Sequence, residues 1–329
     1  MSYIAVMGAG SWGTTLACLL AEKGYDVSLW AFETDIVDEI NAKGTNSTYL
    51  PGGVLPPGLK ATSNYEEAVR RARYILSVVP TQFTRAVFRE CVKYIHEDAV
   101  IISASKGIEQ KTLLTVSAIL NEILGCQCAV LSGPSFAKEV IKKFPTAVTL
   151  ATHNPDTGLL LQEIFNTNYF RVYTHTDVLG VELGGALKNV IAIASGISDG
   201  LGLGYNARAA LITRGISEMM RLGECMGADK RTFSGLSGMG DLVLTCTGPL
   251  SRNYSVGIKL GEGMKLSAIL SSTKSVAEGV ATAFSAFELS KRQGVEMPIV
   301  EQVYKVIYED KDPARAVHEL MNRALKSEF

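Results

Sequence analysis

One lysine lies in the most apolar helical stretch of the second half of this 329-residue chain. Lys188 follows Gly184–Leu187, whose small and apolar side chains are typical of a buried helix. Such a lysine either extends its ammonium group to water or projects into a cleft. In a cleft, burial or a second cation such as Lys106 would lower its pKa and suit it to proton transfer. Lys188 is therefore the candidate general acid for a carbonyl oxygen, and Asn189 could hydrogen-bond the same oxygen.

Two later segments place further polar groups near glycine-rich turns. Asp241 lies within Gly235–Thr247 and starts an apolar helical stretch, where it either caps that helix or pairs with Lys188. Ser251–Asn253 follow a Gly-Pro-Leu turn and run into another helix. A hydroxyl, a guanidinium and an amide at a helix start make a compact phosphate receptor, and a plain surface turn is the alternative.

A glycine-rich loop near the N-terminus predicts a dinucleotide site. Gly8–Gly13 reads G-A-G-S-W-G, follows the first apolar run immediately and opens a helical stretch. Glycines at these positions permit a tight turn, let a pyrophosphate approach the backbone, and allow the helix to pack closely on the strand. The helix N-terminus then offers free N–H groups and the positive end of its dipole to the phosphates.

An acidic residue at the end of the second predicted strand supports the same site. Glu33 lies about 20 residues after Gly13, where a carboxylate can accept a hydrogen bond from the ribose 2′-hydroxyl. The next basic residue is Lys43, so the charge pattern favours NAD over NADP. Glu33 could instead be a solvated residue that starts the next helix, and Phe32 could cover the adenine face or belong to the core.

Other strand ends in the first half carry further candidates. Val78–Gln82 and Ser103–Gly107 follow later predicted strands, where ligands collect in an open α/β sheet. Lys106 is a candidate for contact with substrate or cofactor, and an exposed loop lysine is the alternative. Gly133 and Ser135 lie in a Gly-Pro-Ser turn on the far side of the predicted cleft and are candidate substrate contacts.

Alternating strand and helix patterns must position these residues in the first half. Helical segments such as Ser11–Lys23, Gln82–Ile95 and Lys111–Leu124 separate apolar runs, several of them apolar enough to be buried on both faces. This alternation predicts a parallel, doubly wound, Rossmann-like sheet of the α/β class, with Gly44–Lys60 as a loop over it. The predicted strands are Tyr3–Gly8, Asp26–Phe32, Tyr74–Pro80, Ala99–Lys106, Ala129–Gly133, Ala147–Ala151 and Tyr169–Tyr173.

The second half changes to helical patterns. Asn154 and Asp312, each followed by proline, mark two helix starts in the chain. The chain is therefore expected to divide into a dinucleotide-binding domain, residues 1–177, and an all-helical substrate and catalytic domain, residues 178–329. Val190–Ile197 would form the buried spine of the second domain and one wall of a cleft. The predicted helices are Val178–Ile197, Ala207–Met226, Val276–Arg292, Ile299–Tyr308 and Ala314–Lys326.

Composition and charge argue against several classes of protein. Apolar residues make up 47% and charged residues 20% of the chain, which is the profile of a globular protein without long disordered stretches. A net charge of -1 gives no attraction to nucleic acid or to anionic membranes. A phosphate-bearing substrate must then be held by local positive charge.

The N-terminus and the cysteines favour a soluble, cytoplasmic protein. The first strand starts at Tyr3, which leaves no room for a signal peptide, and no apolar run reaches the ~20 residues of a membrane span. The six cysteines show no disulfide framework, and Cys126 and Cys128 are too close for an ordinary metal site with no His nearby. We therefore expect no metal and no disulfide.

Taken together, these segments resemble the NAD(P)-dependent glycerol-3-phosphate dehydrogenase family of the bacterial type. The Gly-Ala-Leu-Lys-Asn helix start followed by Asp199-Gly200 is the specific part, because a glycine-rich loop alone is weak evidence. The segments that carry the resemblance span nearly the whole chain. They are Gly8–Gly13, Ser105–Gly107, Gly133–Glu139, Gly185–Gly200, Gly238–Leu242, Ser251–Asn253 and Val276–Gly279.

The resemblance implies interconversion of dihydroxyacetone phosphate and sn-glycerol 3-phosphate, a supply of the latter for phospholipid synthesis, and a homodimer. It also implies that the helical domain is similar to that of 6-phosphogluconate dehydrogenase. Lys188 is implied as the general acid/base, with Asp241 and Lys106 as further candidate catalytic residues. The implied substrate contacts are Lys106, Gly133, Ser135, Lys188, Asn189, Asp241, Ser251, Arg252 and Asn253. The implied cofactor contacts, beside Gly8, Gly10, Gly13, Phe32 and Glu33, are Ser11, Trp12, Lys106, Ala137, Arg252, Val276 and Glu278.

One departure from the family concerns the cofactor. Many bacterial members carry an Arg just after the Trp of the second strand and use NADPH. Here Trp30 is followed by Ala31, Phe32 and Glu33, as in NAD-using eukaryotic members. NAD is therefore the preferred prediction, with NADP as the alternative.

Three other functions fit parts of the pattern. A dehydrogenase for a β-hydroxy acid on the same architecture would need an anion site suited to a carboxylate. A non-catalytic dinucleotide sensor would keep the glycine-rich loop but need not keep Lys188, Asp241 and Ser251–Asn253 together. A structural module without a ligand would need none of these groups.

Overall fold

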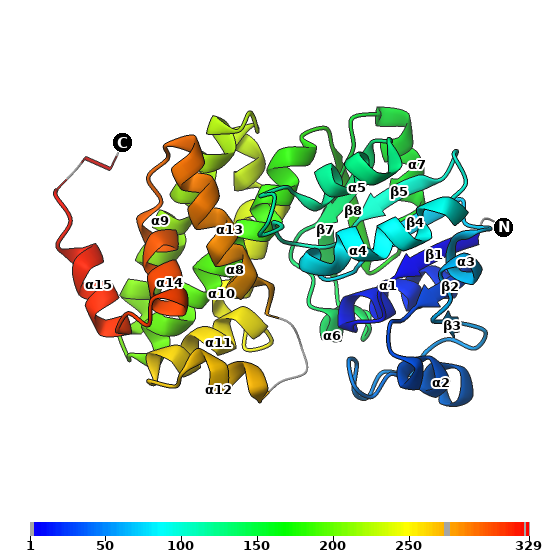
Figure 1. The fold of residues 1–329 in the computed structure, drawn as a ribbon, viewed down its shortest axis with the longest axis horizontal. Coiled ribbons are helices and arrows are strands. Elements are labelled where there is room, and N and C mark those ends of the chain that lie inside the picture. The colour runs from blue at the N-terminus through cyan, green and yellow to red at the C-terminus, as the bar shows by residue number, and fades with distance from the viewer. Residues whose placement is uncertain (1–2, 273–276, 326, 329) are drawn as a thin grey trace. The chain divides into compact units, whose positions relative to one another are not determined.

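The structure is a computed structural model that describes residues 3–272, 277–325 and 327–328. The chain forms two compact units, an α/β unit and a helical unit, whose elements are labelled in Figure 1. Unit 1 consists of Met1–Lys106 and Leu114–Glu182, and unit 2 of Gly107–Leu113 and Leu183–Phe329.

The division differs from the expected boundary after residue 177 in two ways. The first turn of helix α8, Val178–Gly200, stays with unit 1, because Val178 and Val181 share a hydrophobic cluster with Val130 and Ala151 of the sheet. The segment 107–113 joins unit 2 instead of the domain in which the sequence pattern placed it. Both differences depend on contacts between residues distant in the chain.

Unit 1 is built on a sheet of eight described strands in the order β3-β2-β1-β4-β5-β6-β7-β8. From β3 to β6 each neighbouring pair is parallel, which agrees with the predicted doubly wound arrangement. The strands are β1 Tyr3–Met7, β2 Asp26–Trp30, β3 Lys60–Thr62, β4 Tyr74–Ser77, β5 Val100–Ser103, β6 Cys128–Ser132, β7 Thr146–Ala151 and β8 Phe170–His175.

The sheet departs from the predicted parallel arrangement at β7. Val130 of β6 pairs with Ala151 of β7 in antiparallel register, whereas β7 and β8 run parallel to each other. The connection between β6 and β7 contains only the one-turn helix α6, Ala137–Val140. A four-residue helix advances about 6 Å, too little to return the chain to the other end of the sheet, so β7 runs back.

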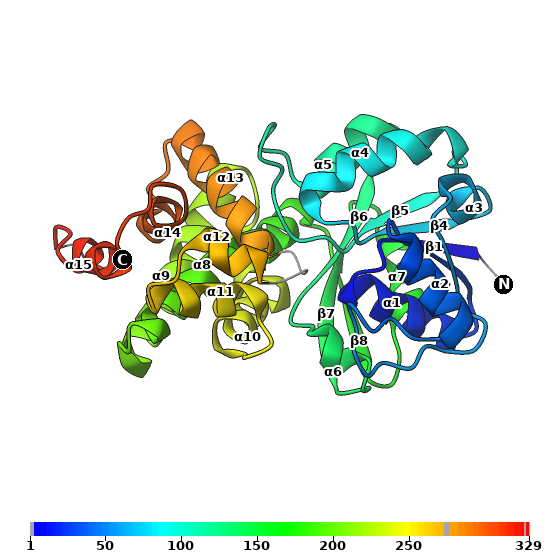
Figure 2. The ribbon, with the colours of Figure 1, turned by 60° about the horizontal axis from the view of Figure 1, so that its bottom comes forward.

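The two faces of the sheet bury separate cores. In β1, Ile4 and Val6 pack in one hydrophobic cluster, and Ala5 and Met7 pack in the other, as the alternation of side chains along a strand requires. The first cluster continues into α1, α2 and α7, and the second into α3, α4 and α5. Figure 2 shows these two sets of helices on opposite faces. The helices are α1 Ser11–Glu22, α2 Thr34–Lys43, α3 Tyr65–Val69, α4 Thr81–Cys91, α5 Val116–Leu124 and α7 Pro155–Phe165.

Several predicted boundaries in unit 1 need correction. Strand β3 was not predicted, because three residues are too few to show a period. Helix α5 begins at Val116 instead of Lys111, and Leu113 before it has a positive φ of 62°, which a helix interior does not allow. The predicted start of α7 is confirmed, since Asn154 accepts a hydrogen bond from Thr157 N.

From Val178 to Met321 the regular elements that the structure describes are all helices, as predicted. Asp312 caps α15 by accepting from Arg315 N, which confirms the second marked helix start. A π-helical turn, Leu236–Gly240, directly precedes α10. Beside α8, the helices are α9 Gly204–Cys225, α10 Asp241–Thr247, α11 Arg252–Gly261, α12 Leu266–Ser271, α13 Glu278–Gln293, α14 Pro298–Tyr308 and α15 Pro313–Met321.

Helix α8 is the buried spine that the sequence predicted. It has 23 residues and is apolar enough, by length and composition, to cross a membrane, although Glu182 and Lys188 interrupt its apolar run. However, 94% of its most apolar window is buried in the protein. This is the property of a core helix, and one such helix is weak evidence for a membrane span.

Candidate active site

The glycine-rich loop Gly8–Gly13 connects β1 to α1 through backbone contacts that exclude side chains. Gly8 has a φ of 122°, and a Cβ there would lie 2.8 Å from Val78 O. A Cβ on Gly13 would lie 1.8 Å from Gly8 O, so the first turn of α1 touches the loop backbone. A Cβ on Gly10 would meet no atom within 4 Å. The loop is therefore tightly packed at its two ends and open in the middle, where a ligand can approach the backbone.

The start of α1 fits the pyrophosphate of a dinucleotide. Gly10 is the N-cap residue and supplies no capping side chain, so the first-turn N–H groups keep their positive potential for an anion. Ser11 is the first helical residue, and its hydroxyl donates to Tyr49 O. Trp12 packs against the core with its ring centroid 6.3 Å from that of Phe170. The residues present thus fit NAD(P) at this loop.

The acidic residue after β2 is placed differently from the expectation. Strand β2 ends at Trp30 instead of Glu33, and Glu33 occupies the N-cap position of α2. The Glu33 carboxylate accepts a hydrogen bond of 2.7 Å from the Tyr49 hydroxyl. Phe32 is 77% exposed, so the suggestion that it belongs to the core is wrong.

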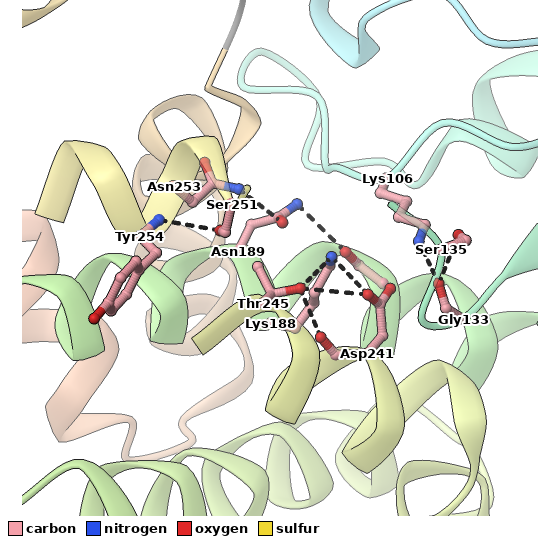
Figure 3. Close-up of polar contacts among 11 residues, drawn as sticks. Lys106, Gly133, Ser135, Lys188, Asn189, Asp241, Thr245, Ser251, Asn253 and Tyr254 are labelled. Carbon is pink, nitrogen blue, oxygen red and sulfur yellow. Dashed lines mark hydrogen bonds and ion pairs between the residues drawn. The ribbon is translucent and has the colours of Figure 1, made fainter. Parts of the chain in front are cut away.

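A first polar group gathers at the ends of β5 and β6 in unit 1 (Figure 3). Lys106 Nζ and Ser135 Oγ both donate to Gly133 O, each at 2.9 Å. Lys106 is half-buried and hydrogen-bonded, so the alternative of an exposed loop lysine is wrong. Ala137 begins α6 close by and accepts a 3.4 Å hydrogen bond from Thr15 of α1, which places α6 beside the helix of the glycine-rich loop.

A second polar group surrounds Lys188 on α8 in unit 2 (Figure 3). Lys188 is 7% exposed and does not extend to solvent, so the snorkelling alternative is wrong. Its ammonium donates to Asp241 Oδ1 at 2.8 Å and to Thr245 Oγ1 at 2.7 Å. Asp241 is 1% exposed, so the carboxylate compensates a charge that water does not reach.

Helix α10 presents Asp241 and Thr245 to this lysine. The π-helical turn that precedes α10 is a local irregularity of a kind that often occurs at functional sites. Gly240 is the N-cap residue of α10, so of the two roles left open for Asp241 the structure shows pairing with Lys188. Sequence reasoning missed Thr245. Its signal was the spacing of four residues from Asp241 on a predicted helix, which puts both side chains on one face.

Asparagine side chains join α8 to the start of α11. Asn253 Nδ2 donates to Asn189 Oδ1 at 2.8 Å, and Asn253 Oδ1 accepts from Gly279 N at 2.9 Å. The two helices cross in backbone contact, because a Cβ on Gly196 would lie 2.1 Å from the carbonyl oxygen of Tyr254. This crossing brings the two asparagines together.

The segment Ser251–Asn253 is a helix start, as predicted, and not a plain surface turn. Ser251 caps α11 by accepting from Tyr254 N at 3.2 Å. Desolvation by the surrounding protein lowers the pKa of the Arg252 guanidinium, and the nearby Glu278 carboxylate opposes this shift. Glu278 is the first residue of α13. The predicted cofactor contact Val276 lies outside the described residues.

Comparisons with known proteins match the whole chain. The N-terminal and C-terminal sequence models of the NAD-dependent glycerol-3-phosphate dehydrogenase family match residues 3–158 and 177–318. The glycerol-3-phosphate dehydrogenase (NAD(P)+) of Geobacter sulfurreducens is 56% identical over 329 residues, covering 99% of this chain and 98% of that protein. The crystal structure of glycerol-3-phosphate dehydrogenase from Coxiella burnetii superposes with a TM-score of 0.95 at 43% identity, covering 98% and 99% of the two chains. A ketopantoate reductase from Ralstonia eutropha, with a TM-score of 0.64, 16% identity and coverage of 96% and 100%, shares the fold alone.

Proposed function

The chain belongs to the NAD-dependent glycerol-3-phosphate dehydrogenase family, and on this premise we propose how its residues carry out the reaction. It catalyses the NAD(P)-dependent interconversion of dihydroxyacetone phosphate and sn-glycerol 3-phosphate. This membership decides against the β-hydroxy-acid dehydrogenase, the dinucleotide sensor and the ligand-free module that fitted parts of the sequence.

Lys188 is the proposed general acid/base. The observation that carries this role is a buried ammonium held by Asp241 Oδ1 and Thr245 Oγ1 at 2.8 and 2.7 Å. An ammonium held in this way can donate a proton to the carbonyl oxygen of dihydroxyacetone phosphate as negative charge develops there. In the reverse direction the neutral amine accepts the proton from the C2 hydroxyl. Asp241 keeps the lysine positioned, which is why we propose it as part of the catalytic group.

The phosphate of the substrate is proposed to bind at the start of α11. The N-terminus of this ten-residue helix carries the positive end of the helix dipole, and Arg252 adds a guanidinium beside it. Asn253 and Asn189 form a hydrogen-bonded pair that links this phosphate site to the lysine one residue earlier on α8. Binding the phosphate there orients the reacting carbonyl, so binding energy away from the reaction centre contributes to turnover.

The dinucleotide is proposed to bind at Gly8–Gly13 and the start of α1. When bound, its nicotinamide supplies or accepts the hydride. Glu33 is proposed to accept from the ribose 2′-hydroxyl and Phe32, exposed at 77%, to cover the adenine. Since a carboxylate at this position repels a 2′-phosphate, we propose NAD as the preferred cofactor. Lys106, Gly133 and Ser135 are proposed to contact the substrate from unit 1, and Ala137, Glu278 and Val276 the dinucleotide.

Oxidation of NADH and of NADPH by the purified protein, with and without dihydroxyacetone phosphate, tests the proposal. Rapid loss of NADH that depends on the substrate is the expected result. Loss of NADPH alone would keep the reaction and refute the argument from Glu33. Activity with 3-hydroxyisobutyrate or 6-phosphogluconate, and none with dihydroxyacetone phosphate, would refute the assignment of dihydroxyacetone phosphate as the substrate.

Three further predictions follow from the family resemblance. A homodimer is proposed, and light scattering of the purified protein measures its mass. A cytoplasmic location is proposed, and cell fractionation tests it. For the supply of glycerol phosphate to phospholipid synthesis, depletion of the protein should stop lipid synthesis, and added glycerol 3-phosphate should restore it.

A further inference from the structure

The segment that connects α2 to β3 is fixed to the glycine-rich loop by a buried asparagine. Asn46 is fully buried, and its Nδ2 donates to Ala9 O at 2.8 Å and to Thr14 Oγ1 at 2.9 Å. Its Oδ1 accepts from Tyr49 N at 3.2 Å. The backbone of Tyr49 is therefore held at a defined place relative to the loop that we propose binds the pyrophosphate.

Tyr49 itself contacts two different parts of the proposed dinucleotide site. Its carbonyl oxygen accepts from Ser11 Oγ at the start of α1. Its hydroxyl donates to Glu33 Oε1 at 2.7 Å, across 16 residues of sequence. One residue thus connects the phosphate-binding loop to the acidic side chain that would recognise the ribose.

We propose that Tyr49 is a positioning residue for cofactor selectivity, which holds the Glu33 carboxylate where it accepts from a ribose 2′-hydroxyl and opposes a 2′-phosphate. The inference rests on the proposed NAD preference and deepens it. A glutamate at a helix start has several rotamers, and in many of them its charge would point into solvent. A hydrogen bond to one carboxylate oxygen selects among these rotamers.

The chemistry of the contact suits this role. A carboxylate accepts about four hydrogen bonds, so the tyrosine leaves capacity for a ribose hydroxyl. The hydrogen bond to Glu33, together with desolvation, raises the pKa of Tyr49 to about 12. The phenol is therefore protonated, and remains a donor, throughout the range in which a dehydrogenase is assayed.

Replacement of the hydroxyl alone tests the proposal. In Tyr49→Phe, the ratio of kcat/KM for NADH to that for NADPH should fall about 10- to 150-fold, the effect of one hydrogen bond to a charged group. The change should appear in the KM for NADH more than in kcat. The matched control is Tyr169→Phe, because the Tyr169 hydroxyl also donates to a glutamate of unit 1, Glu22, at 3.5 Å. That control should keep the wild-type ratio.

A double-mutant cycle with Glu33→Ala separates positioning from general damage. If Tyr49 acts through Glu33, adding Tyr49→Phe to Glu33→Ala should leave the cofactor ratio where Glu33→Ala alone put it. A further change of the ratio in that background, or an unchanged ratio in Tyr49→Phe alone, would overturn the inference. A wild-type preference for NADPH would overturn it too. Absence of any triose-phosphate-dependent oxidation in the wild type would instead refute the proposed function.

Discussion

The polar groups of the two units differ in kind: unit 1 offers backbone N–H groups, and unit 2 offers buried side chains. In unit 1 the loop Gly8–Gly13 offers backbone N–H groups, and its glycines leave no room for side chains at two of three positions. In unit 2 the polar group consists of side chains removed from water, with Lys188 7% exposed and Asp241 1% exposed. We propose that the first group binds its ligand through backbone N–H groups that no side chain covers, and that the second acts through paired, buried side chains.

This difference determines how each site can be damaged. A backbone site is harmed when a side-chain atom is added, since the new atom meets a main-chain neighbour that cannot move aside. A buried ion pair is harmed when one partner is removed, because the remaining charge stays buried without compensation at a cost of about 3–5 kcal/mol. The predictions below use the two kinds of change to test the comparison.

The largest effect is expected at the lysine of unit 2. Lys188→Met should lower kcat by about 10³-fold, because a positioned general acid contributes 10²- to 10⁴-fold. Binding of NADH, measured by fluorescence titration, should stay near the wild-type value, since the glycine-rich loop lies in the other unit. The variant should also be less stable than the wild type in urea, because the buried Asp241 carboxylate loses the positive charge of its ion-pair partner.

The double variant Lys188→Met/Asp241→Asn separates catalysis from folding. It removes both charges, so its free energy of unfolding should recover most of what the single variant lost. Its kcat should stay as low as that of the single variant. Recovery of turnover together with stability would show that the lysine has a structural role only.

The next largest effect is expected where an atom is added in unit 1. Gly13→Ala should lower the melting temperature by several degrees and weaken NADH binding at least 10-fold, since its Cβ would lie 1.8 Å from Gly8 O. Gly10→Ala is the matched control, because a Cβ there meets no atom within 4 Å. It should keep the melting temperature and weaken NADH binding only. Equal melting temperatures for both variants would contradict the described loop packing.

A smaller effect is expected at the proposed phosphate site. Arg252→Ala should raise the KM for dihydroxyacetone phosphate roughly 10- to 100-fold, the effect of losing one or two charge-assisted hydrogen bonds. Arg231→Ala is the control, because Arg231 pairs with Asp229 at the surface of the same unit and its side chain is 87% exposed. If both variants had the wild-type KM, the phosphate would bind elsewhere.

The parts of the site that could be predicted are those with a local signal. The glycine-rich loop is recognised within six residues, and Lys188 stands out because a charge interrupts an apolar helix. The pairing of Lys188 with Asp241, at a separation of 53 residues, was one of two alternatives that the sequence left open, the other being a helix cap. The choice depended on how α8 and α10 pack, and the sequence of neither helix determines this alone.

The features that were missed depend on contacts between distant segments. Tyr49 lies in a stretch that reads only as a loop, and its link to Glu33 follows from the way Asn46 fixes that stretch to the glycine-rich loop. The reversal of β7 depends on the length of α6, which is too short to show helical periodicity. The first turn of α8 belongs to unit 1 because two valines pack on the sheet. In each case a tertiary contact decides what the local pattern leaves open.

The smallest effect tests whether burial of a charge in unit 2 is by itself a sign of catalysis. Glu218 of α9 is 1% exposed and accepts from Ile299 N at 2.7 Å and Val300 N at 3.2 Å, so it caps the start of α14. Burial raises its pKa to about 7, against these hydrogen bonds and the charges of Arg221 and Arg323. Glu218→Gln should keep kcat near the wild-type value.

The pH dependence of its stability shows the structural role. Because the pKa of Glu218 is raised in the folded protein, the folded state binds more protons than the unfolded state between about pH 4.5 and 7. Stability is therefore lost as the pH rises through this window, by at most roughly 3 kcal/mol. Urea unfolding at pH 5 and pH 8 should show a smaller loss in Glu218→Gln than in the wild type, whereas Glu224→Gln, at an exposed position of the same helix, should lose as much as the wild type. Parallel losses in all three proteins would mean that Glu218 remains charged across the window, and a large fall in kcat would extend the catalytic group of unit 2 to α9.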